Sequence, residues 1–422
     1  MKMKKNIVLL SILFLATFYV SADLVLSSSE DVEVIGGGIS LGGGNTVSGG
    51  NASVSGGYGN SASGDYATIG GGFGNSAMQD YSSVCGGFSN SANAYASSVG
   101  GGASNIASSS YSTVSGGLSN IAGEQSAFVG GGQSNYADGL NSVIAGGYDN
   151  YISSVGSESV IAGGGENNIT SYNCFIGGGQ TNRVSSHHSA VVGGEWNNAT
   201  NFHSFVGGGK YNLADGNSAV VAGGRYNKAT ASGATVGGGQ RCYATEALST
   251  VSGGEDNTAS GSRSTVSGGD TNTASGGYSA VAGGCGNTAG GDYDFVAGGQ
   301  DNTAEGSYSF AAGRQAYAAT PGSFVWADSQ DASFATATTD NVFLIRASGG
   351  VGITGDSAST DIADPLATVH IDDVLLLEPT DSPSVSCDGS HEGAMYADDS
   401  LNKLCYCDGT SWKQIDDFTQ TC

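Results

Sequence analysis

Branched apolar residues recur along most of this chain at a fixed interval of 15 residues. Each Val or Ile of the series stands six residues before a slot that is nearly always Asn, and a Gly pair usually lies between the two. Seventeen of the eighteen slots hold Asn, and Cys242 occupies the other one. Self-similarity at one period is typical of stacked supersecondary units. The series includes the apolar residues Val54, Val84, Val114, Val206, Val251 and Val296, and the slot residues Asn60, Asn90, Asn120, Asn182, Asn212, Asn257 and Asn302.

A repeat with a Gly pair at its centre predicts strands and turns, because Gly pairs break helices and let the backbone reverse. Val between small or hydroxylated residues is typical of a short strand with one buried face. Asn side chains stacked one above another are expected to form an amide ladder. The pattern therefore predicts an all-β fold, a repetitive parallel β-roll or β-solenoid of about eighteen 15-residue coils over residues 36–320. Two extra residues between Asn150 and Asn167 should loop outward.

Each coil supplies one large apolar side chain for burial, which is a thin core for 15 ordered residues. We therefore expect several chains to share the core, most simply as a homotrimer. A second pattern favours contact between chains, because the position seven residues before the slot becomes apolar in the middle of the array. If Val faces inward, these residues face outward, either toward another subunit or as a ligand-binding stripe. They are Phe128, Val143, Val160, Phe175, Ala190, Phe205 and Val220.

The chain ends flank this array with different composition. Residues 1–22 have a basic start, an apolar run and small residues near position 22, as a secretory signal peptide does. Residues 23–35 form an N-terminal lead-in, residues 321–380 a β-rich neck module, and residues 381–422 a β-hairpin cap. We expect a secreted, extracellular protein at the cell surface, with no membrane insertion after the signal is removed.

Charge narrows the choice of partners. The net charge is −25, and removal of the signal takes away Lys2, Lys4 and Lys5, which leaves −28. Such an acidic surface repels nucleic acid and anionic lipid, so neither is an expected partner. The expected partners are further copies of the chain and a surface protein or glycan.

The segment Ser112-Thr113-Val114-Ser115-Gly116-Gly117-Leu118-Ser119-Asn120-Ile121-Ala122 resembles the head repeats of YadA-type trimeric autotransporter adhesins. Those repeats read Ser-Val-Ala-Ile-Gly-x-x-Ala-x-Ala, and the resemblance covers about residues 36–320. It implies a left-handed parallel β-roll trimer that binds host matrix or cell surfaces. The period here is 15 where the family mostly shows 14, and neither a heptad stalk nor a C-terminal barrel anchor is recognisable.

The C-terminal region resembles a different group of proteins. Residues 341–353, 366–371, 392–396 and 403–412 are similar to strand modules and hairpin caps of phage-type tail fibres. This resemblance implies a β-rich end to the rod, and it makes a phage or virion receptor-binding fibre an alternative function.

Four cysteines lie close together near the C-terminus, which in an exported chain favours two disulfides. They are Cys387, Cys405, Cys407 and Cys422, and three connectivities are possible. Cys405 and Cys407 face the same side of one strand, so we expect Cys387 to bond one of them and Cys422 the other. Cysteines within the repeats occupy different positions of the coil and are interpreted as single small residues of the stack.

No catalytic constellation is recognisable, and we expect neither an enzyme nor a cofactor. His188 and His203 lie one repeat apart and are weak candidates for a metal site, in a column that elsewhere holds Tyr. The hypothesis that fits best is a fibrous adhesin or structural protein. A soluble ice- or glycan-binding β-solenoid is a further alternative, because Thr235, Thr250 and Thr265 repeat at the same position of three successive coils.

Overall fold

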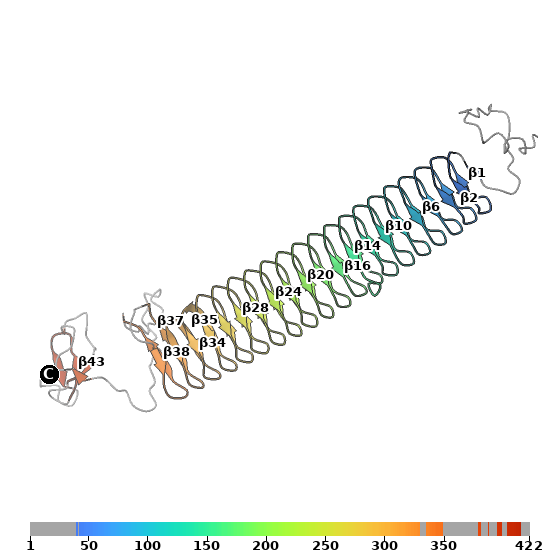
Figure 1. Ribbon diagram of the computed structural model, residues 1–422. Coiled ribbons are helices and arrows are strands. Elements are labelled where there is room, and N and C mark those ends of the chain that lie inside the picture. Colours follow the sequence, from blue (N-terminus) through green and yellow to red (C-terminus); the bar gives the residue numbers. More distant parts are fainter. Residues whose placement is uncertain are drawn as a thin grey trace, which may run out of the picture. The chain divides into compact units, whose positions relative to one another are not determined.

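The computed structural model describes residues 39–40, 42–329, 335–348, 379–380, 387, 395–398 and 403–414. The predicted signal peptide, the lead-in and Cys422 lie outside these residues. The chain divides into two units, residues 1–349 and residues 350–422. The first contains a long stack of coils (Figure 1), and the second a small sheet.

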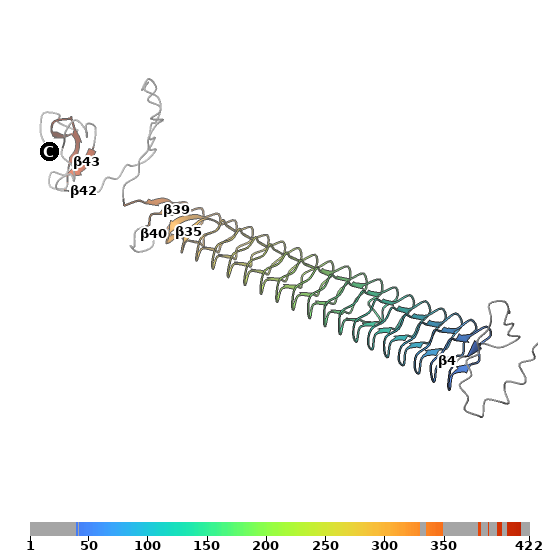
Figure 2. The same ribbon diagram turned by 90° about the horizontal axis from the view of Figure 1, so that it is seen from above.

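The repeats fold into a parallel β-solenoid with about one coil per 15 residues, as predicted. Each coil contributes two short strands to two parallel sheets. Sheet A contains the odd-numbered strands, and from β3 (Ser53–Val54) to β33 (Ala280–Val281) each consists of the two residues that end in the Val or Ile position. Sheet B contains the even-numbered strands, and from β2 (Thr46–Val47) to β36 (Thr303–Ala304) each consists of the two residues that follow the Asn slot. Figure 2 shows the strands stacked in register along the rod.

The core of one chain is formed by columns of identical residues. The Val and Ile side chains of sheet A are fully buried, and so are the Ala side chains at the second position of the sheet B strands, such as Ala122 and Ala259. A column of Ser closes the opposite turn, where Ser112 Oγ donates to the carbonyl oxygen of Ser109 at 2.6 Å. The Ala column makes the core of a single chain complete, so sharing the core between chains is not needed to close it.

The Asn slots link neighbouring coils through both side chains and backbone. Asn120 Nδ2 donates to the carbonyl oxygen of Gly116 in its own coil and to that of Gly132 in the next, at 2.9 and 2.8 Å. Asn120 Oδ1 accepts the backbone N–H of Asn135 at 3.0 Å. Asn120 itself is fully buried, and the carbonyl oxygens that face it need donors from within the stack. Only a side chain with both a donor and an acceptor at this reach satisfies them, which explains the repeated Asn.

Two further corners of the coil hold non-Gly residues in the left-handed region. One follows sheet B by four residues and includes Tyr66, whose φ is 60° and whose N–H donates to the Gly50 carbonyl oxygen at 2.8 Å. The other precedes the Asn slot by one residue and includes Tyr226, with φ 58°. The left-handed backbone points these N–H groups back to the preceding coil. Each such residue carries a strain of order 1 kcal/mol that the bond between coils offsets.

The predicted insertion lies between β16 (Tyr151–Ile152) and β17 (Val160–Ile161). The two strands keep their register with the coils on both sides. The additional residues loop outward beside β16 (Figure 1), and Val155 in this segment is 61 % exposed. The core columns continue past the insertion without a break.

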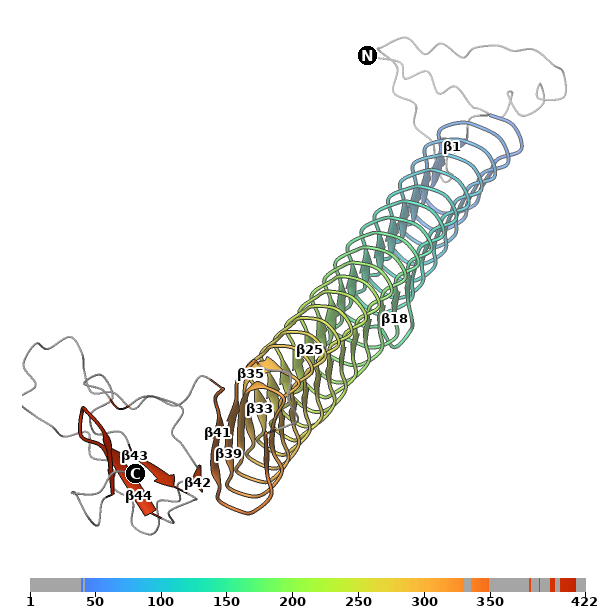
Figure 3. The ribbon, with the colours of Figure 1, turned by 90° about the vertical axis from the view of Figure 1, so that its left-hand side faces the viewer.

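The solenoid extends past residue 320, where the repeat pattern ends. Longer strands β35 (Phe295–Gln300), β37 (Phe310–Arg314), β39 (Phe324–Ala327) and β41 (Phe343–Arg346) continue sheet A. Strands β38 (Ala316–Ala318) and β40 (Ala335–Ala337) continue sheet B, and Figure 3 shows these broader strands at the end of the stack. Residues 321–329 and 335–346, expected in a separate neck module, therefore belong to the stack.

The described residues of the second unit form four strands: β42 (Pro379–Thr380), β43 (Met395–Asp398), β44 (Lys403–Cys407) and β45 (Trp412–Gln414). Strands β43, β44 and β45 pair antiparallel, and β42 pairs parallel with β43. The predicted β-rich C-terminal hairpin is present.

Cys242 is the one interruption of the Asn column, and it provides a test of the column's contribution to stability. Its thiol makes only long contacts, at 3.5 Å, with the carbonyl oxygens of Gly253 and Gly254, and it offers no Oδ1 to the N–H of Asn257. We expect Cys242→Asn to raise the free energy of unfolding by about 1–2 kcal/mol, because it supplies the missing hydrogen bonds. Urea unfolding followed by circular dichroism measures this, with Cys242→Ala as the control that adds no amide. A Cys242→Asn variant less stable than the native chain would contradict the role given to the column.

Asp294 occupies a position of the buried Ser column, and its carboxyl group should make the stability of the fold depend on pH. Its carboxylate accepts hydrogen bonds from the backbone N–H groups of Gly291 and Ser309, at 2.6 and 2.9 Å. Burial outweighs these bonds and raises the pKa of Asp294 above its usual value of 3.8. A carboxyl whose pKa rises on folding stabilises the fold most below its unfolded pKa, and this contribution is lost as the pH rises through the folded value.

We therefore expect Asp294→Ser, which restores the residue found in neighbouring coils, to be more stable than the native chain at pH 7. The advantage should shrink as the pH falls toward about 4, where an Asp carboxyl is ordinarily half protonated. Thermal unfolding at a series of pH values measures the difference. An advantage that is the same at every pH would rule out titration of Asp294 as its cause.

Candidate binding faces

The outer face of sheet A changes character along the rod. It presents Ser and Thr from Ser53 to Thr113, apolar side chains from Phe128 to Val220, and Thr again at Thr235, Thr250 and Thr265. The predicted outward orientation of the middle segment is confirmed, since Phe175 is 41 % exposed beside a fully buried Ile176. Contiguous exposed apolar residues of this kind usually mark a contact surface.

The same face ends in a stack of aromatic rings. Phe310, Phe324 and Phe343 lie on successive strands with ring centroids 4.3 and 4.8 Å apart, and Phe343 is 70 % exposed. Trp326 lies in the adjacent outward column, beside Ile345. Sequence reasoning missed this stack because its members are spaced by 14 and then 19 residues instead of by the period of 15.

The outer face of sheet B carries the longest run of Thr. Thr258, Thr273, Thr288 and Thr303 occupy the same outward position of four successive coils. The sequence analysis recognised only the three-residue Thr run of sheet A. The signal for the second run was present, because all four residues follow an Asn slot directly.

Tyr ladders line one of the left-handed corners. Tyr278, Tyr293 and Tyr308 stack with centroids 5.0 and 4.9 Å apart and nearly parallel planes. Tyr66 and Tyr81 repeat the arrangement near the other end of the rod. Rings stacked in this way cover one another's faces and expose their edges and hydroxyl groups.

The two weak metal candidates lie in the same column as these Tyr residues. The rings of His188 and His203 are 5.3 Å apart and pack against Phe202, while His187 Nδ1 is hydrogen-bonded to Ser171 Oγ. Among the described residues, no group of three or more His, Cys, Asp or Glu side chains is arranged to hold a metal ion. The column is an outward corner position that holds Tyr in several coils, His in two and non-aromatic residues such as Ser218 in others.

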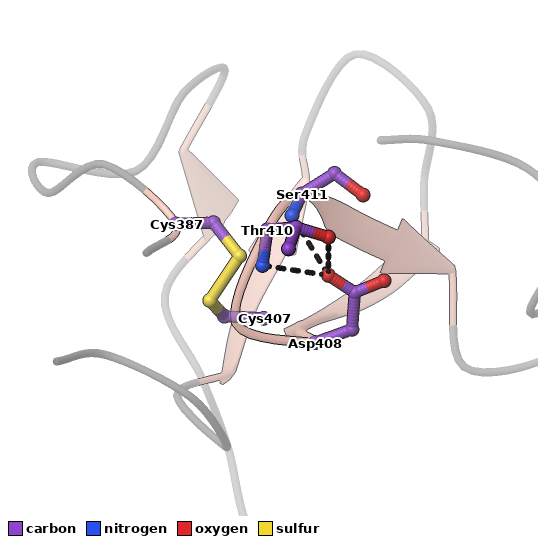
Figure 4. Close-up of a disulfide and its surroundings, with 5 residues drawn as sticks. All are labelled: Cys387, Cys407, Asp408, Thr410 and Ser411. Atoms are coloured by element: carbon purple, nitrogen blue, oxygen red, sulfur yellow. Dashed lines mark hydrogen bonds between the residues drawn. A yellow bond between two sulfur atoms is a disulfide. The ribbon is translucent and has the colours of Figure 1, made fainter. Parts of the chain in front are cut away.

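The cysteines divide as the sequence indicates. Cys387 and Cys407 form a disulfide (Figure 4), which is one of the pairings left open by the sequence. Cys405 is also disulfide-bonded. The turn beside this disulfide is held by Asp408, whose pKa is lowered to about 2 by hydrogen bonds from Thr410 and Ser411. Within the repeats, Cys85, Cys174, Cys242 and Cys285 are free.

Comparison with known proteins adds no family. No protein-family model matches the chain, and no curated protein is significantly similar to it. The described residues contain no helix long and apolar enough to cross a membrane. The functional proposal therefore rests on the repetitive fold and on the chemistry of the side chains in its outward-facing columns.

Proposed function

We propose that this protein is an extracellular fibrous adhesin, a rod that attaches to other surfaces and acts without catalysis. The observation that carries the proposal is the repetition of outward side chains in register along the stack. Such columns give several equivalent contacts in a line, and linked weak contacts add up to strong attachment. The YadA-like repeat sequence and the signal-like residues 1–22 support the same function and an extracellular location.

The proposal includes self-association as a homotrimer. The surface that supports it is the outer face of sheet A, where Phe128, Phe175 and Phe205 lie half-buried to exposed on one column. Because each chain closes its own core, subunits would meet through this face instead of through a shared interior. Burial of a Phe side chain is worth roughly 1.5–3 kcal/mol, so several such contacts could hold chains together.

Attachment is tested by measuring binding of the purified protein to a panel of immobilised matrix proteins and polysaccharides. We expect saturable binding to at least one class of surface, with dissociation much slower for protein immobilised on beads than for protein in solution. Binding to no member of the panel, by protein shown to be folded, would count against an adhesive function.

The Thr run of sheet B favours a second candidate, binding to ice or another ordered hydrated surface. Four consecutive Thr residues form a flat hydroxyl array on a rigid parallel sheet, longer than the run recognised in the sequence. A thermal-hysteresis measurement on the purified protein tests it. Activity that is lost in Thr273→Lys but retained in Ser218→Lys, at an exposed corner, would support this candidate.

A further inference from the structure

The positive charges of this acidic protein are concentrated on a few neighbouring coils. The chain has 13 Lys and Arg residues, and three of them lie within residues 1–22. Between residues 202 and 245 there are four basic residues and a single acid, Asp215. The coils on either side are acidic or neutral. The basic residues of this segment are Lys210, Arg225, Lys228 and Arg241.

Most of these residues lie together at one corner of the rod, between the Gly turn and sheet B. Lys210 and Arg225 are direct neighbours on successive coils, joined by a parallel bridge. The residues that follow them, Tyr211 and Tyr226, stack with centroids 4.9 Å apart and an interplanar angle of 2°. Lys228 lies two residues further on, on the outer face of sheet B. We name these five residues the cationic corner.

The charges at the two ends of the cluster are neutralised, and those in the middle are not. Lys210 pairs with Glu195 at 2.8 Å, while Arg241 pairs with Glu255 at 2.7 Å and with Asp256 at 2.5 Å. Within the described part of the chain, Arg225 and Lys228 have no carboxylate partner. Both side chains are exposed.

Tyr rings support the two unpaired cations. The Arg225 guanidinium lies 4.9 Å from the centroid of Tyr226, and the Lys228 ammonium 5.7 Å from that of Tyr243. Cation–π contact of this kind favours a particular position for a side chain that would otherwise sample many. Because Tyr211 and Tyr226 cover each other's faces, they present edges and hydroxyl groups to solvent. Aromatic edges carry partial positive charge, so the rings and the cations favour the same kind of ligand.

We propose that the cationic corner binds an anionic polysaccharide, one that carries sulfate or carboxylate groups. Guanidinium and ammonium groups supply charge-assisted hydrogen bonds to such anions, and the Tyr hydroxyls can bond sugar hydroxyls. A linear polymer suits the site because its cations and rings repeat along the rod instead of converging in a pocket. Nucleic acid fits less well, since its dense phosphates would meet two free cations on a strongly acidic protein. The inference rests on the proposed adhesive function and names the ligand of one of its faces.

The experiment compares single variants that remove the same charge from different corners. Arg225→Gln and Lys228→Gln, alone and together, alter the cationic corner. Arg263→Gln is the matched control, because Arg263 is also exposed and also lies over a Tyr ring, at 5.2 Å from the centroid of Tyr278, but in a different column. The probes are heparin for sulfate, polygalacturonate for carboxylate, neutral dextran and single-stranded DNA. Binding is measured at 0.05 and 0.15 M NaCl.

We expect the full-length protein to bind heparin or polygalacturonate and not dextran, with weaker binding at the higher salt. Each single variant of the corner should weaken binding roughly fivefold and the double variant at least tenfold, given the strength of exposed charge-assisted contacts. Arg263→Gln should change it less than twofold. The probe that binds more tightly distinguishes a sulfated from a carboxylated ligand.

Four results would overturn the inference: binding to neither anionic polysaccharide, equal binding to dextran, tighter binding to DNA, or an equal loss in Arg263→Gln. Circular dichroism of every variant confirms that a loss does not come from unfolding. The adhesive function is decided separately by the surface panel. If the protein binds neither heparin nor polygalacturonate but does bind another member of that panel, the inference fails and the proposed function stands.

Discussion

Replacement of Gly194 by Ala is expected to destabilise the solenoid by about 3–5 kcal/mol. Gly194 has φ +87°, and a Cβ atom there would lie 2.1 Å from the carbonyl oxygen of Gly209 in the next coil and 2.6 Å from Asn197 Nδ2. The side chain would have to displace both the backbone of the next coil and the Asn column. The loss is measured by urea unfolding followed by circular dichroism, and proteolysis would locate the cleavage near this coil.

The adjacent residue provides a matched control. A Cβ at Gly193 meets nothing within 4 Å, and its φ lies outside the left-handed range. Gly193→Ala should therefore change stability by no more than about 0.5 kcal/mol. If the two variants lose the same stability, close approach between coils at the second Gly is not the reason for the Gly pair.

The second large effect is expected at Asn135, in the middle of the Asn column. Its Nδ2 donates to the carbonyl oxygens of Gly131 and Gly147 at 2.9 and 2.8 Å, and its Oδ1 accepts the N–H of Asn150 at 3.1 Å. Asn135→Ala leaves the Gly131 carbonyl oxygen and the Asn150 N–H without partners, and it removes one of the two bonds to the Gly147 carbonyl oxygen, which also accepts the N–H of Gln133 at 2.9 Å. Since each costs roughly 1–3 kcal/mol and some can rearrange, we expect a loss of about 3–5 kcal/mol.

Two further variants separate the hydrogen bonds from other effects of the substitution. Asn135→Asp keeps the shape and the acceptor but loses both donors and adds a charge, so it should be at least as harmful as Asn135→Ala. Asn217→Ala is the control at an exposed corner, where the side-chain oxygen accepts one bond, from Ser218 Oγ at 2.9 Å. It should cost less than about 1 kcal/mol. A stable Asn135→Asp variant would show that the amide donors contribute little.

The Val and Asn columns could be predicted from the sequence because each residue type has the same role in every coil: Val fills the core, and Asn hydrogen-bonds the turns of neighbouring coils. Val114 and Val129 pair in adjacent strands and Asn120 bonds Asn135, so a period of 15 residues in sequence becomes one coil in space. The outward position of Phe175 followed from the alternation of a strand. One large apolar side chain per coil predicts a thin core, whereas the structure adds a second, fully buried column of small residues to which Ala122 belongs.

The extent of the solenoid was harder to predict. After Asn302 the next coil is joined through Ala316, whose N–H donates to Asn302 Oδ1. Ala316 follows Asn302 by 14 residues instead of 15, and it stands where the repeat would have Asn. Longer strands with more backbone pairing, such as β39 and β41, replace the side-chain column there. A search for Asn at every fifteenth residue therefore stops at Asn302, where longer strands begin to link the coils in place of the Asn side chains.

The cationic corner was also beyond reach of the sequence pattern. Lys210 and Arg225 occupy the same position of the repeat, but Lys228 lies in another one, and it joins them only because the coil turns between the bridge column and sheet B. Which of these charges is already paired depends on neighbours 15 residues away, such as Glu195. Net charge alone indicated repulsion of nucleic acid and anionic lipid, whereas the folded chain places three of its cations, Lys210, Arg225 and Lys228, together at one corner.

The most direct test of an adhesive rod is retention of protein-coated beads on a surface under flow. The surface should carry whichever member of the panel binds the purified protein, with uncoated beads and beads carrying heat-unfolded protein as controls. The account predicts that beads coated with folded protein stay attached at flow rates that remove both controls. Beads that wash away together with the controls would contradict an adhesive function for this rod.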